Sequence, residues 1–152
     1  MSQSIKLNND IYWDQTGVKD LAVVNNTYTP TITWTDGSTA PTIDINDFRY
    51  MSYGGHVYWI SGRFRITNLG TPGSSAHLQI SLPSVILNTA SYGACAVGVV
   101  YCSDAAQMST TSGDFLIRKY PDYLCIVRGA QGNPSASYFT TGYYVVSAMF
   151  IV

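Results

Sequence analysis

Tyr50–Pro83 reads YMSYGGHVYWISGRFRITNLGTPGSSAHLQISLP: a glycine turn, a long alternating segment, a Gly/Pro/Ser loop, and a shorter segment that ends at Leu-Pro. Residues 57–67 alternate without interruption between two series of side chains. One series is Val57, Trp59, Ser61, Arg63, Arg65 and Thr67, and the other is Tyr58, Ile60, Gly62, Phe64 and Ile66. Successive side chains of a strand leave opposite sides of the backbone, so a sustained period of two predicts a half-buried antiparallel strand.

The composition agrees with a β-rich fold. All nine acidic residues are aspartates, about a fifth of the chain is Ser or Thr, and there are 12 tyrosines. Glutamate is a common filler of exposed helix faces, whereas Thr, Tyr, Val and Ile suit a pleated surface. The 152 residues are enough for one domain with a single hydrophobic core.

Further short alternating segments follow one another from residue 28 onward. They lie at 28–35, 43–50, 78–82, 95–101, 115–119, 123–128 and 142–152, with Ile43 and Ile45 continuing toward Phe48 and Tyr50. Turn residues separate them at the spacing typical of sandwiches, and no helical period competes. We therefore expect residues 28–152 to form an all-β, antiparallel β-sandwich that is jelly-roll-like. Gly62 and Gly98 lie inside strand patterns, where glycine marks either a bulge or a close backbone approach.

The first 27 residues differ from the rest of the chain. They contain two short apolar segments around a turn of Asn and Asp, followed by a linker from Gly17 to Thr27. An isolated hairpin is marginally stable in water, so its apolar side chains are expected to dock on another surface. The side chains predicted to anchor the chain in this way are Ile5, Leu7, Ile11, Tyr12 and Trp13.

Charge and cysteine content exclude several classes of protein. The formal net charge is −1 with scattered basic residues, which argues against nucleic-acid binding. The longest apolar run is too short to span a membrane, and no signal-peptide pattern is visible. The three cysteines form no Cys-x-x-Cys pair and are expected to be reduced thiols in a protein assembled in a cytoplasm.

The sequence offers little for catalysis, and we expect no enzyme activity, cofactor or metal site. His56 and His77 have no carboxylate or cysteine at ligand spacing, and Asp44 and Asp47 lack the spacing of a calcium loop. Glycoside hydrolysis usually needs two facing carboxyl groups, and the aspartates lie mostly at turn-like positions. No Gly-x-Ser-x-Gly elbow is present.

The last strand pattern, residues 142–152, is apolar on both faces. In a sandwich with one wet face, the outer side of such a strand is expected to meet another subunit. Val145, Met149 and Ile151 are therefore candidates for an oligomer interface. Tyr138 and Tyr143 are candidates for binding a ligand, because exposed tyrosines stack on sugar rings and offer a hydroxyl group.

The segments RYMSYGGHVYWISGRFRIT (49–67) and LQISLP (78–83) resemble a pattern in the terminal knobs of bacteriophage head and tail fibres and other virion appendage proteins. IKLNNDIYWDQTGV (5–18) resembles short N-terminal segments of phage minor structural proteins. The resemblance implies a homotrimeric jelly-roll head on the surface of the phage particle, made in the host bacterial cytoplasm. It further implies that the N-terminal segment binds another virion protein.

These observations lead to one main functional hypothesis and two alternatives. The main hypothesis is a non-enzymatic phage structural protein, a trimeric head- or tail-fibre knob. It would attach to a host-surface glycan or decorate the capsid or tail. The alternatives are a stand-alone carbohydrate-binding module and an accessory subunit of a polysaccharide depolymerase.

Overall fold

The computed structural model describes residues 4–7, 10–14, 24–53, 57–86, 95–102, 115–128, 136 and 139–151. For residues 4–7, 10–14, 95–102, 115 and 128 the description covers the backbone alone. Eleven strands and one short 3-10 helix lie within these ranges.

The first two strands form the predicted N-terminal hairpin. β1 (Ser4–Leu7) pairs antiparallel with β2 (Asp10–Asp14), and these two strands make a sheet of their own. The backbone of the hairpin is thus confirmed. The side chains predicted to anchor the chain lie outside the described residues, so their role stays a prediction. They are Ile5, Leu7, Ile11, Tyr12 and Trp13.

The other described strands join in one antiparallel sheet with the order β3-β5-β6-β11-β8-β9-β10-β7-β4. Their bounds are β3 Val24–Tyr28, β4 Ile32–Trp34, β5 Thr42–Tyr53, β6 Val57–Asn68, β7 Leu78–Ser81, β8 Cys95–Cys102, β9 Phe115–Lys119, β10 Tyr123–Arg128 and β11 Gly142–Ile151. The 3-10 helix η1 covers Ser84–Ile86. The hairpin of β9 and β10 turns at Pro121 and Asp122, between two of the predicted alternating segments.

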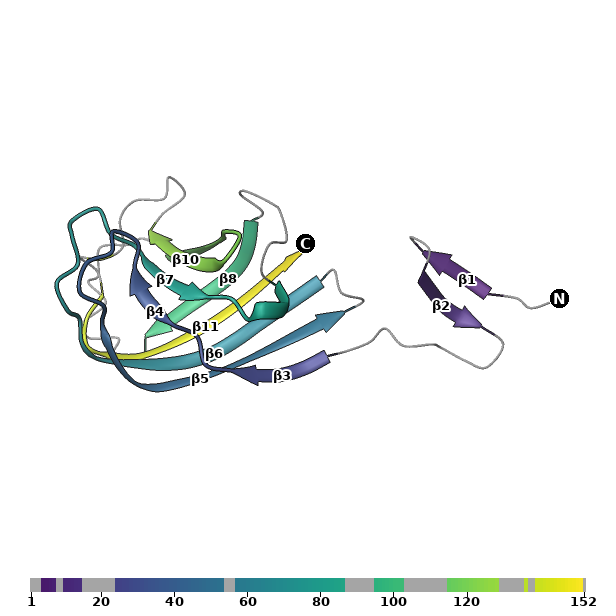
Figure 1. Cartoon of the computed structure of the whole chain (residues 1–152), viewed down its shortest axis with the longest axis horizontal. Helices are drawn as coiled ribbons and strands as arrows, with labels where there is room; N and C mark the ends of the chain where they lie inside the picture. Colours follow the sequence, from purple (N-terminus) through teal and green to yellow (C-terminus); the bar gives the residue numbers. More distant parts are fainter. Residues whose placement is uncertain are drawn as a thin grey trace.

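β8 belongs to two layers, and this makes the sheet a sandwich. Its first residues, Cys95 and Ala96, pair with β9, whereas Val97–Cys102 pair with β11. The sheet therefore folds over at β8, which places β3, β5, β6 and β11 in one layer and β4, β7, β9 and β10 in the other (Figure 1). The predicted all-β antiparallel sandwich is confirmed. The finer expectation of a jelly-roll strand order is not.

The core lies between the two layers and is rich in aromatic rings. Phe64 stacks on Tyr144 with ring centroids 5.2 Å apart, and Phe139 lies between Tyr144 and Trp34. Trp34 is 1% exposed, and its indole N–H donates a hydrogen bond to the Leu69 carbonyl at 2.9 Å. A buried Trp needs such a partner, because an unpaired N–H in the core is destabilising.

The sandwich begins earlier than the sequence predicted. β3 starts at Val24, inside the segment interpreted as a linker up to Thr27, and pairs with β5 from Val24↔Ser52 to Tyr28↔Phe48. Residues 24–27 are all exposed. An edge strand with no buried side chains shows no apolar alternation, which is the signal used to find strands.

A bulge in β5 corrects a second detail. The pairing of β5 with β6 shifts register between Ile43 and Ile45, where Ile43 pairs with Ile66 and Ile45 with Arg65. A bulge inserts one extra residue and changes which side chains face inward. Ile45 therefore shares a face with Arg65, instead of continuing the buried series toward Phe48.

Candidate functional site

The surface that gathers functional side chains is the side of β3, β5, β6 and β11 that faces away from the core, here called the outer face. Strand pairing arranges it in rows that cross the sheet. From the Val57 end of β6 toward its Asn68 end, the rows follow in this order. The first two are Tyr53, Val57 and Ile151, then Asn25, Met51, Trp59 and Met149. The last three are Thr27, Arg49, Ser61 and Ser147, then Asp47, Arg63 and Val145, then Ile45, Arg65 and Tyr143.

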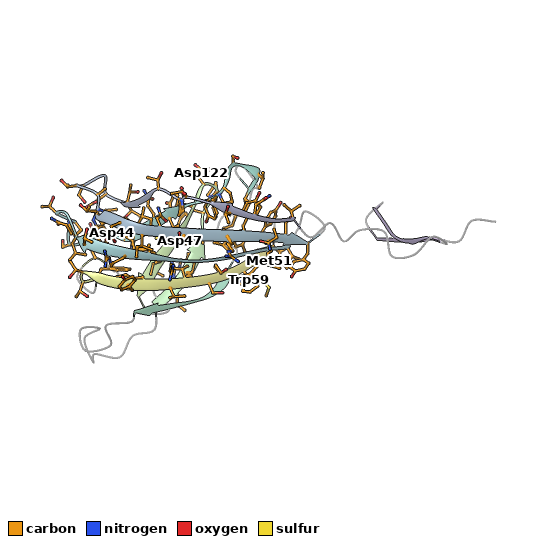
Figure 2. The ribbon with its side chains drawn as sticks, turned by 90° about the horizontal axis from the view of Figure 1, so that it is seen from below. Asp44, Asp47, Met51, Trp59 and Asp122 are labelled. Carbon is orange, nitrogen blue, oxygen red and sulfur yellow. The ribbon has the colours of Figure 1, made fainter. Side chains whose placement is uncertain are left out.

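Apolar side chains occupy one end of this outer face. The apolar half consists of Met51, Tyr53, Val57, Trp59, Met149 and Ile151. Trp59 is 41% exposed, Met149 54% and Ile151 66%. The indole N–H of Trp59 donates a hydrogen bond to Ser147 Oγ at 2.8 Å, which orients the ring across the sheet. Figure 2 shows Met51 and Trp59 together at this end, with Asp44 and Asp47 toward the other.

The predicted interface residues all lie on the outer face. Met149 and Ile151 belong to the apolar half, and Val145, 47% exposed, lies in the row of Asp47 and Arg63. The opposite side of β11 is buried, so the two-sided apolar pattern of this strand reflects one core face and one exposed face.

Ion pairs dominate the other end of the outer face. Arg63 contacts Asp47 at 3.1 Å, with both side chains more than 60% exposed. Arg65 pairs with Asp44, donating from Nε to Oδ1 at 2.7 Å. Exposed pairs of this kind add little to stability, about 0–1 kcal/mol each.

Tyr143, a predicted ligand-binding residue, is already engaged within the chain. Its hydroxyl oxygen accepts a hydrogen bond from Arg65 at 3.0 Å, and the guanidinium carbon of Arg65 lies 5.1 Å from the ring centroid. One face of the ring is therefore covered by a cation, which is a cation–π contact. Tyr138, the other predicted ligand-binding residue, lies outside the described residues.

An open groove lies where β3 leaves the sheet. It has a volume of about 960 Å³ and is lined mostly by polar residues of β3, β5 and β6, together with Thr29, Phe48, Gly62 and Val145. Asn46 holds its edge by donating from Nδ2 to the Pro30 carbonyl at 2.7 Å. The Asn46 Oδ1 and the Tyr28 hydroxyl are buried, and neither has a hydrogen-bond partner among the described residues.

The groove also contains two cations that the sequence did not single out. Arg49 and Arg63 both line it, and Arg49 forms no ion pair within the described part of the chain. Burial raises the pKa of Tyr28 far above its usual value, so its hydroxyl stays protonated. The groove was missed because it depends on the crossing from β3 to β4, which no local pattern reports.

The described residues contain no cluster suited to a metal ion, and the Cys125 thiol among them is unreactive. Within those ranges, no three His, Cys or Asp side chains come together at a distance suited to a metal ion. Burial raises the pKa of the Cys125 thiol to about 12, which leaves almost no reactive thiolate at neutral pH. No helix in the described ranges is long and apolar enough to cross a membrane.

Compared with models of protein families, with curated proteins and with solved structures, the chain matches none.

Proposed function

We propose that this protein is a non-enzymatic structural subunit that associates with copies of itself through the apolar half of its outer face. In this proposal it is the trimeric β-sandwich knob of a phage virion appendage, a head or tail fibre or a decoration protein. The single observation that carries the self-association is the contiguous exposure of Trp59, Met149 and Ile151 on a regular sheet.

Energetics favour covering these side chains. Full burial of one Met or Ile side chain contributes about 1.5–3 kcal/mol, and association itself costs about 4–15 kcal/mol. An interface must therefore cover several such side chains at once, and two adjacent rows supply six. A sheet face of this kind packs well on another sheet, because side chains interdigitate between layers about 10 Å apart.

The assignment to a virion rests on the sequence. The segments that resemble fibre knobs occupy parts of β5, β6 and β7, which are central strands of the sandwich. The hairpin of β1 and β2 forms its own sheet, which fits an element that binds another protein of the particle. A trimer follows from the same resemblance.

The oligomeric state tests the self-association. Light scattering of the full chain at micromolar concentration should give three times the 16.6 kDa mass of one chain. Met149→Lys should reduce that mass toward one chain, because a charge in an apolar interface is strongly unfavourable. Thr67→Lys, an exposed change at the other end of β6, should leave it unchanged. A wild-type monomer at this concentration overturns the proposal.

Purified particles test the virion assignment. The full chain should be detected in gradient-purified particles of the phage that encodes it. A variant starting at Val24, which keeps β3 and lacks the hairpin, should fold and oligomerise but fail to incorporate. Absence of the full chain from such particles contradicts the assignment. A monomeric protein that binds a glycan would instead favour the stand-alone carbohydrate-binding module.

A further inference from the structure

We propose that the groove at the end of β3 binds an acidic carbohydrate, with the sugar carboxylate held between Arg49 and Arg63. This inference deepens the proposed attachment function by naming a ligand class and a place for it. The groove is built within one chain, so it does not need the oligomer.

The groove exists because two paired strands differ in length. β3 ends at Tyr28, whereas β5 extends in the direction of Thr42 without a β3 partner for residues 42–47. The chain then passes through residues 29–31 to β4 in the other layer. Asn46 ties this crossing to β5 through its hydrogen bond to Pro30, which keeps the groove open beside Asp47.

The two arginines are placed to act on one anion. Arg49 pairs across the sheet with Ser61, and Arg63 lies two residues farther along β6. Diagonal neighbours in an antiparallel pair are about 7–8 Å apart, within reach of two long side chains. Arg49 is exposed and has no ion pair among the described residues, and Arg63 has only the exposed pair with Asp47. A planar guanidinium binds a carboxylate through two parallel hydrogen bonds.

The neutral lining of the groove favours a ligand with many hydroxyl groups. Ser61, Thr27 and Thr29 line the groove with hydroxyl groups, which can both donate hydrogen bonds to a sugar and accept them from it. The Tyr28 hydroxyl and Asn46 Oδ1 are covered and lie beneath this surface, so they support the wall and do not contact the ligand. An acidic peptide would satisfy the arginines but would bring few hydroxyls for the remaining groups.

Titration calorimetry of the full chain tests this inference with sialyllactose and tetragalacturonate as acidic probes. Their neutral counterparts are lactose and the fully methyl-esterified tetragalacturonate, and a tetra-aspartate peptide represents an acidic protein. At least one acidic sugar should bind about tenfold more tightly than its neutral counterpart and than the peptide. Binding of neither acidic sugar at millimolar concentration, or equal binding of the neutral probes, overturns the inference. Tighter binding of the peptide overturns it in favour of a protein ligand.

Variants locate the site and separate it from the oligomer. Arg49→Gln and Arg63→Gln should each weaken binding of the acidic sugar about tenfold. Arg65→Gln is the matched control, because Arg65 is an outer-face arginine of β6 that does not line the groove. Equal losses in all three variants would contradict the proposed site. The mass of each variant in solution is measured in parallel, so a trimer that binds no sugar defeats only the groove, and a monomer that binds sugar defeats only the self-association.

Discussion

Gly62 on β6 lies directly against the ring of Phe48 on β5. The two residues are register partners, and the pairing on either side of them is regular, so no bulge occurs at this position. A Cβ on Gly62 would clash with Cγ and Cδ1 of Phe48 and would lie 2.7 Å from the Asp47 carbonyl oxygen. Of the interpretations that the sequence left open for this glycine, close approach within one chain is the one observed.

Gly62→Ala should therefore destabilise the sandwich. Phe48 is 1% exposed and cannot swing into solvent, so the added methyl overpacks the core and should lower the free energy of unfolding by about 1–3 kcal/mol. Urea unfolding measures the loss. Combining Gly62→Ala with Phe48→Leu should cost less than the sum of the two single changes, because the smaller side chain leaves room for the methyl. Ser61→Ala, on the outer face, is the control, and equal stability of Gly62→Ala and wild type would contradict the packing described.

The hydroxyl of Tyr144 secures the turn that precedes β11. It accepts a hydrogen bond from the Thr140 backbone N–H at 2.9 Å and donates one to the Thr140 carbonyl at 2.8 Å. Tyr144→Phe keeps the stacked ring but removes both bonds, and should cost about 1–2 kcal/mol in thermal or urea unfolding. Tyr53→Phe, which changes an exposed tyrosine, should stay within about 0.5 kcal/mol of wild type. If Tyr144→Phe and Tyr53→Phe changed the free energy of unfolding equally, the hydrogen bonds to Thr140 would contribute nothing to stability.

His77 should make the sandwich less stable in mild acid. Burial lowers its pKa below the usual 6.5, and the charge of Arg118 lowers it further. Below pH 6.5 the unfolded chain therefore binds a proton at His77 more readily than the folded chain does. The contribution of neutral His77 to the free energy of unfolding is complete above pH 6.5 and is lost as the pH falls through the pKa of His77 in the folded protein. Melting temperatures at pH 5.5 and 7 should differ more for wild type than for His77→Gln. His56 is present in both proteins, and an identical pH response of the two would disprove the effect of His77.

The thiol of Cys125 should be inert in the folded protein. Its pKa of about 12 leaves little thiolate at pH 8, so iodoacetamide should modify the peptide 120–128 slowly in native protein and fast in urea, as measured by mass spectrometry. Because the pKa is raised, the contribution of the protonated Cys125 thiol to the stability of the fold is complete below about pH 9 and is lost as the pH rises toward 12. Equal labelling in both conditions would show that the thiol is not buried.

Most of the fold was predicted from the alternation of apolar and polar residues along single strands. Tyr58, Ile60 and Phe64 are buried and Trp59 and Arg63 are exposed, as the period of two indicated. The alternation along β11 likewise placed Met149 and Ile151 on the side away from the core, where both are exposed, and their role in an oligomer interface stays a prediction. These successes share a cause, because in each case the signal lies within a single strand.

The failures involve contacts between strands. The bulge at Ile45 depends on the pairing of β5 with β6, and the exposed β3 has no apolar pattern of its own. Lys119 is fully buried, with its Nζ 5.9 Å from the centroid of the Phe150 ring, although lysine usually indicates a solvent-exposed position. The groove of Arg49 and Arg63 likewise exists only once the chain has crossed from β3 to β4 in the other layer.

The position of β11 constrains the order in which the chain can fold during synthesis. β11 lies between β6 and β8, and β6 is made some 80 residues before its partner. Until residues 142–151 leave the ribosome, one edge of β6 has no partner and its exposed backbone groups invite pairing with other chains. The layer of β3, β5, β6 and β11 therefore closes only after β11 is made, and a chain cut short before Gly142 would leave β6 and β8 as open, aggregation-prone edges.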